Sequence, residues 1–78
     1  MKELVQFLAR SLVSNPDAVE VSESAVEDAA VYKLRVAQDD LGRIIGKQGR
    51  TAKSIRTILN AAASKTNRKV VLEIVEEN

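Results

Sequence analysis

The chain has 78 residues, of which 45% are hydrophobic and 29% are charged, with a net charge of +1, so we expect one domain over residues 1–78. It contains neither cysteine nor histidine, which excludes disulfides, thiol nucleophiles, imidazole bases and nearly all structural zinc sites. These absences favour a binding protein over an enzyme, and we expect no cofactor and no metal. No apolar run approaches the roughly 20 residues of a membrane span and no signal peptide is recognisable, so we expect a cytoplasmic protein without membrane contact.

The first predicted element is an amphipathic helix over residues 2–13. Asn15-Pro16-Asp17 should end it, because the residue before a proline is pushed out of the helical region. The two aromatic residues of the chain, Phe7 and Tyr32, are both expected in the core. The apolar residues on one side of this helix are Leu4, Val5, Phe7, Leu8, Leu12 and Val13.

Two strands follow the helix. Residues 19–24 alternate between polar and apolar, and a second run with the same period lies near residues 31–37. The polar segment Glu27-Asp28-Ala29 between them predicts a hairpin turn. The residues expected on the inner face of the second strand are Tyr32, Leu34 and Val36.

A short helix, a glycine-containing turn and a longer helix are predicted next. Asp39 and Asp40 are expected to cap the short helix, residues 41–45, because a carboxylate accepts hydrogen bonds from free amides at a helix start. The longer helix should run over residues 50–65 and end at Thr66-Asn67, and residues 70–75 should form a well-buried strand. The apolar positions of the longer helix are Ala52, Ile55, Ile58, Leu59 and Ala62.

The order helix-strand-strand-helix-helix-strand predicts an α+β fold in two layers, a three-stranded mixed sheet with helices packed on one face. The two helices between the second and third strands form a crossover, which places those strands parallel. The first strand should pair antiparallel with the other edge of the second strand.

Charge is distributed unevenly along the chain. Residues 1–40 hold four basic and eight acidic residues, residues 41–72 hold eight basic and no acidic residues, and three glutamates follow. This asymmetry is consistent with a polyanionic partner, although a solvated surface that keeps the protein in solution is the alternative.

The segment from Arg43 to Arg50 contains two glycines three residues apart, preceded by an apolar pair and flanked by cations. Glycine permits a sharp reversal and lets backbone amides approach a phosphate without a Cβ between them. The helix that begins there directs its free N–H groups and its dipole toward the same point. The segment is therefore a candidate site for a sugar-phosphate backbone, with the apolar pair as a floor for bases. The candidate contact residues are Arg43, Ile44, Ile45, Gly46, Lys47, Gln48, Gly49, Arg50 and Lys53.

Three interpretations of this segment compete. Two glycines at this spacing by themselves are also typical of a plain corner between two helices. A nucleotide P-loop fails, because Leu41 stands where the first glycine is needed and Gln48 where a hydroxyl is needed. The third interpretation is a GxxG clamp that holds about four single-stranded nucleotides.

The motif I-I-G-K-Q-G-R-T, between two helices of a chain with this element order, resembles the KH domain in its bacterial type II topology. A KH domain of this size over residues 1–78, with its GxxG loop at residues 46–49, is similar to the bacterial KhpA family of small RNA-binding proteins. The resemblance implies single-stranded RNA binding in the cytoplasm, a homodimer, and a heteromer with a larger KH-containing partner, KhpB. It also implies RNA chaperoning and a part in the control of cell shape and division.

A protein–protein adaptor that uses a KH fold without RNA contacts is the second hypothesis, and an enzyme is a distant third. Cations alone surround the loop, which favours RNA over the adaptor. Ala61-Ala62-Ala63 leaves part of the longer helix smooth. Those alanines reflect either helix propensity or a close helix–helix contact between two copies.

Overall fold

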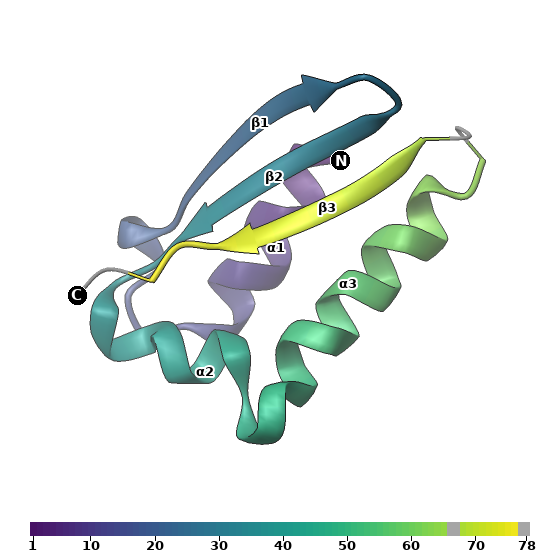
Figure 1. The fold of residues 1–78 in the computed structure, drawn as a ribbon. Coiled ribbons are helices and arrows are strands. Elements are labelled where there is room, and N and C mark those ends of the chain that lie inside the picture. Colours follow the sequence, from purple (N-terminus) through teal and green to yellow (C-terminus); the bar gives the residue numbers. More distant parts are fainter. Residues whose placement is uncertain (66–67, 77–78) are drawn as a thin grey trace.

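Helices cover one face of a three-stranded sheet in the computed structural model, which describes residues 1–65 and 68–76 (Figure 1). The predicted order of elements and the α+β class are confirmed, and the predicted helix end at Thr66-Asn67 lies outside the described residues. In the part of the chain that is described, no helix is long and apolar enough to cross a membrane. The elements are α1 (Lys2–Leu12), β1 (Glu20–Val26), β2 (Ala29–Arg35), α2 (Leu41–Ile45), α3 (Arg50–Ala63) and β3 (Lys69–Ile74), with single 3-10 turns at Pro16–Ala18, Gln38–Asp40 and Lys47–Gly49.

The strand order β1-β2-β3 and both predicted pairings are confirmed. β1 and β2 form an antiparallel hairpin in which Val26 lies opposite Ala29, so Glu27 and Asp28 make the turn. β2 and β3 are parallel, with Tyr32 opposite Leu72, as the crossover through α2 and α3 requires.

The core lies between the inner face of the sheet and the helices. Tyr32 is 3% exposed, as predicted, and its hydroxyl donates a hydrogen bond to Glu23 Oε2 at 3.2 Å. Leu34 of β2 and Leu59 of α3 are almost fully enclosed, and burial of each such side chain contributes about 1.5–3 kcal/mol. The buried core residues are Val5, Ala9, Val19, Val21, Ala30, Tyr32, Leu34, Ile44, Ile55, Leu59 and Leu72.

The prediction that Phe7 lies in the core is wrong, because its side chain is 67% exposed. α1 contacts the core through Val5 and Ala9. At about 100° per residue, Phe7 lies about 200° around the helix from Val5 and faces the solvent. The apolar residues of this helix therefore span a wider arc around its axis than the part of the helix that is buried.

On α3, Ile55, Leu59 and Ala63 face inward, whereas Ile58 is 44% exposed. The burial prediction for the last strand is wrong. β3 is not well buried: Leu72 is enclosed, whereas Val71 is 41% exposed on the face of the sheet that the helices leave open. An edge strand with one covered face buries only alternate side chains.

Candidate nucleic-acid interface

The turn between α2 and α3 depends on both of its glycines. Gly46 has φ 77° and ψ 170°, a conformation that is essentially restricted to glycine. A Cβ on Gly46 would clash with Thr51 Oγ1 and would lie only 2.7 Å from the Thr51 backbone nitrogen. Gly49 has φ 75° and ψ 11°, in the left-handed region, but a Cβ there would have no atom within 4 Å. Gly46 is therefore required by packing and by conformation, and Gly49 by conformation alone.

The two residues between the glycines are exposed at the tip of the turn. Gln48 has φ 59°, so it too is left-handed, and the Gly49 N–H donates to the Gly46 carbonyl at 3.1 Å. This reversal leaves the side chains of Lys47 and Gln48 in solvent. The turn therefore presents bare backbone at Gly49 beside one exposed cation, Lys47.

Positive charge surrounds the turn. Arg43 on α2 and Arg50 and Lys53 on α3 are all exposed, as Lys47 is. α3 begins at Arg50 with no side-chain cap and no acidic residue in its first turn, so its free N–H groups and dipole add to the positive field. The predicted cationic residues thus lie on the turn and on the adjoining parts of both helices.

The apolar pair of the predicted site is divided by the fold. Ile44 is fully buried and packs in the core beneath α2, whereas Ile45 is half-buried. Ile44 therefore supports the turn from within the molecule. Ile45 is the member of the pair with surface available to a ligand.

The predicted helix cap at Asp39 and Asp40 is wrong, because no side-chain cap bond is made at the start of α2. Asp40 is 1% exposed, and its carboxylate accepts hydrogen bonds from the Ser14 N–H at 3.0 Å, the Ser14 hydroxyl at 2.8 Å and the Asn15 N–H at 3.1 Å. These bonds join the end of α1 to the start of α2. The Ser14 backbone N–H is the main cause that holds the pKa of Asp40 below its usual value, against the desolvation that raises it.

Asp40 also contacts the candidate site directly. Arg43 Nε lies 3.5 Å from Asp40 Oδ1, and the Arg43 side chain is 63% exposed. The buried carboxylate therefore neutralises part of the charge of Arg43 and restrains one side of its guanidinium. The other side of the guanidinium remains open to solvent.

The free edge of β3 is a further candidate contact surface, which the sequence did not indicate. The Lys69 N–H donates to the Asp28 carbonyl and the Val75 N–H to the Leu34 carbonyl, so the odd-numbered residues of β3 face β2. Because the direction of the peptide groups alternates along a strand, Leu72 and its even-numbered neighbours direct their polar groups toward the free edge. Arg56 of α3 confirms this, since its Nη2 donates to the Leu72 carbonyl at 3.3 Å.

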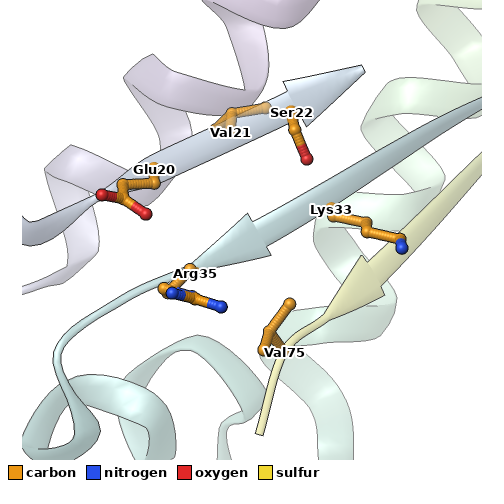
Figure 2. Close-up of a pocket in the computed structure, with 6 residues that line it drawn as sticks. All are labelled: Glu20, Val21, Ser22, Lys33, Arg35 and Val75. Carbon is orange, nitrogen blue, oxygen red and sulfur yellow. The ribbon is translucent and has the colours of Figure 1, made fainter. Parts of the chain in front are cut away.

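A hollow lies on the open face of the sheet, where Lys33 and Arg35 project beside Glu20, Ser22 and Val75 (Figure 2). Glu20 is the register partner of Arg35, and Glu73 is the register partner of Lys33. Acidic residues therefore stand beside both cations on the open face, unlike the surface around the turn. This compensation makes the open face a weaker candidate for a polyanion.

The chain is similar to several known proteins. A family model described as KhpA/KhpB, KH domain, matches residues 2–74. The chain is similar to the RNA-binding protein KhpA of Clostridium perfringens, at 52% identity over 75 residues that cover 96% of this chain and 100% of that protein. It is also similar to the RNA-binding protein KhpA of Chlamydia trachomatis, at 47% identity and 99% coverage of both chains, and to that of Listeria monocytogenes, at 43% identity over 97% of this chain and 100% of that protein.

A solved structure of Aquifex aeolicus Era bound to GDP and AlF4− shares the fold, with a TM-score of 0.59 at 23% sequence identity. The match covers 97% of this chain and 31% of the Era chain, so this chain spans less than a third of Era. That likeness concerns the fold alone.

Proposed function

Because the chain belongs to the KhpA/KhpB KH-domain family, we propose that it binds single-stranded RNA through the turn Gly46–Gly49. The relatives are named as RNA-binding proteins, and a GxxG loop in a KH domain holds about four nucleotides by their backbone. The proposal involves no catalytic step. It treats residues 1–78 as one KH domain acting in the cytoplasm.

The observation that carries the proposal is the backbone conformation of the turn. A phosphate can approach Gly49 without meeting a Cβ, because the space where a Cβ would stand is open, and Lys47 stands between the two glycines with its amine in solvent. Arg43, Arg50 and Lys53 supply further positive charge on either side of the path. The sugar-phosphate backbone would be held at the turn by amides and cations together.

Bases would lie toward Ile45 and the free edge of β3. The outward peptide groups of this edge offer hydrogen bonds to base edges, and Arg56 already occupies one of them at Leu72. Tyr32 is buried and Phe7 lies on α1, so no aromatic platform for stacking is available around the turn. Recognition would then depend on hydrogen bonds and aliphatic contact, which accounts for an expected affinity in the micromolar range or weaker.

The proposal includes two protein–protein contacts, one with a second copy of this chain and one with a different KH protein. We infer that α3 mediates a homodimer, since Ile58 is 44% exposed and Ala61 and Ala62 leave the same helix smooth on its exposed side. The family includes KhpB as well as KhpA, which supports a heteromer with a larger KH-containing KhpB protein. On the family resemblance, we extend the proposal to RNA chaperoning and a part in the control of cell shape.

The decisive experiment replaces Lys47 and Gln48 together by aspartate. The change is −2 at the lysine and −1 at the glutamine, on exposed residues of a left-handed turn that aspartate tolerates. Affinity for a single-stranded RNA oligonucleotide, measured by fluorescence anisotropy, should fall at least tenfold, about 1.4 kcal/mol. The free energy of unfolding should change by no more than about 0.5 kcal/mol.

The matched control is Lys2→Asp with Gln6→Asp on α1, which makes the same change of charge toward the opposite end of the molecule (Figure 1). This control should keep most of the parental affinity. If the Lys47→Asp/Gln48→Asp variant folds and still binds RNA like the parent, the turn only connects two helices and the proposed function is wrong. The adaptor alternative predicts no RNA binding by any of the three proteins.

A further inference from the structure

The exposed face of α1 carries an aromatic side chain that the fold does not use. Phe7 is 67% exposed, the most exposed of the large hydrophobic residues that the structure describes. α1 packs on the sheet through Val5 and Ala9, on its opposite side. A single exposed apolar residue is common and assigns nothing by itself, so the charged neighbours of Phe7 decide what this face can bind.

Those neighbours are of opposite sign. Glu3 and Arg10 line one shallow hollow with Phe7, together with Gln6 and Ser11, so all of them lie on one exposed stripe of the helix. At 1.5 Å per residue, Glu3 lies about 6 Å before Phe7 along the helix axis and Arg10 about 4.5 Å after it. An acid and a base are thus placed almost symmetrically about an aromatic ring. Such a stripe is complementary to the same stripe on a second copy when the two helices run antiparallel.

We propose that α1 of a second copy of this chain packs antiparallel on this stripe, about a two-fold axis near Phe7. The two Phe7 rings then contact each other, and each Glu3 pairs with the partner's Arg10 at an axial offset of about 1.5 Å. Both pairs form at once, because a two-fold contact repeats every interaction.

The charged groups of the stripe are available for this contact. The Glu3 side chain is 90% exposed, and its carboxylate lies 3.7 Å from the N-terminal ammonium, which leaves it open to a second cation. Arg10 is exposed and has no ion-pair partner among residues 1–65 and 68–76. Neither residue has to break an enclosed interaction in order to pair across the axis.

A nucleic acid is a poorer occupant of this stripe. The Glu3 side chain is 90% exposed on the stripe, so a phosphate backbone laid along Phe7 and Arg10 would also meet a carboxylate. A strongly acidic or strongly basic partner would match only one of the two charges beside Phe7. Self-complementarity therefore favours a second copy.

This contact is separate from the one inferred on α3 and does not depend on RNA binding. The α3 contact is inferred at Ile58, Ala61 and Ala62, none of which belongs to the stripe of α1. If both contacts form, each copy joins two others, and the assembly grows beyond a dimer with concentration. The α1 contact buries a short helix stripe rather than the roughly 800 Å² per partner of a stable interface, so it should be weak.

Charge reversal tests the proposal by sedimentation equilibrium of the full chain at up to about millimolar concentration in low salt. Glu3→Arg and Arg10→Glu should each weaken self-association about fivefold or more, because like charges then face each other twice. An equimolar mixture of these two variants should associate like the parent, since both ion pairs form in the mixed dimer, one between the unchanged Glu3 and Arg10 and one between the two substituted residues. Phe7→Ser should weaken association without recovery on mixing.

The controls are Asp17→Arg and Lys33→Glu, which make the same changes of net charge on exposed residues outside the stripe and should leave association unchanged. A parent that stays monomeric, single reversals that associate like the parent, or a mixture that fails to recover would each overturn the proposal. So would a loss of self-association on Ala62→Trp combined with no effect of the α1 variants. If Phe7→Ser lowers RNA affinity and leaves self-association intact, the stripe contacts RNA and the proposal is wrong, while the proposed function stands.

Discussion

Alanine substitution at each of the three glycines should change the free energy of unfolding in three different ways. Gly42 lies in α2 with negative φ, and a Cβ there would have no atom within 4 Å. Gly42→Ala should therefore stabilise the fold by about 0.5–1 kcal/mol, the usual advantage of alanine over glycine in a helix. Gly49→Ala should cost about 1 kcal/mol, since an ordinary residue pays roughly 1–2 kcal/mol in the left-handed region and nothing else is in the way.

Gly46→Ala should be the most destabilising of the three. Its φ of 77° with ψ 170° costs an ordinary residue about 1–3 kcal/mol, and the added Cβ would be driven against Thr51 Oγ1 and the Thr51 backbone nitrogen. Relief requires the start of α3 to move, so the total should reach about 3 kcal/mol or more. In a domain of this size, 1 kcal/mol corresponds to a Tm shift of roughly 4–8 °C.

Thermal and urea unfolding followed by circular dichroism measure the whole series. The expected order of stability is Gly42→Ala, then the parent, then Gly49→Ala, then Gly46→Ala. A Gly46→Ala protein as stable as Gly49→Ala would refute the close approach of Thr51. RNA affinity should fall with Gly49→Ala, because its methyl group enters the open space where a phosphate would approach the backbone, and with Gly46→Ala, because the shift at Thr51 distorts the turn.

Three further predictions concern charge and association. Asp40→Asn should cost about 2 kcal/mol or more, because the amide cannot accept all the hydrogen bonds from Ser14 and Asn15 and loses the charge that strengthens them. The pKa of Asp40 is lower in the folded state than in the unfolded state, so the carboxylate contributes fully to stability above about pH 4, and this contribution is lost as the pH falls through the folded-state pKa. Acidification should therefore lower the free energy of unfolding less in Asp40→Asn than in the parent. RNA binding with three to five neutralised phosphates should give a slope of log K against log salt of about −2 to −3.5, and a slope near zero would contradict a phosphate clamp. Ala62→Trp should weaken the α3 contact in sedimentation experiments while circular dichroism shows a folded protein, and an unchanged association would remove α3 from the interface.

Much of the fold follows from periodicity in the sequence. The repeat of apolar residues changes from helical to strand-like and back along the chain, which predicts the six main elements in order. The crossover through two helices predicts that β2 and β3 are parallel. Gly46 and Gly49 mark the turn because few other residues adopt a positive φ there.

Burial on the helices and strands was harder to predict from the same pattern. Phe7 and Val5 both belong to the apolar arc of α1, but the sheet contacts the helix over a narrower arc that includes only Val5. Ile44 and Ile45 are adjacent and chemically identical, yet only Ile44 points into the core. A pattern of apolar residues gives the period of an element, whereas its rotation is set by the neighbours that it packs against.

Interactions between distant residues were decided by tertiary structure alone. In the sequence, Asp40 has every feature of a local helix cap, but packing brings the Ser14 and Asn15 amides within 3.1 Å of its carboxylate and turns it toward α1. The direction of the β3 peptide groups depends on which residues pair with β2, and the position of Arg56 beside Leu72 depends on how α3 lies along that edge. The sequence by itself determined the order of elements, the turn and its charge, because these depend on near neighbours along the chain. The partner of Asp40, the free edge of β3 beside α3 and the exposed Phe7 depend on how the elements pack, which no local pattern contains.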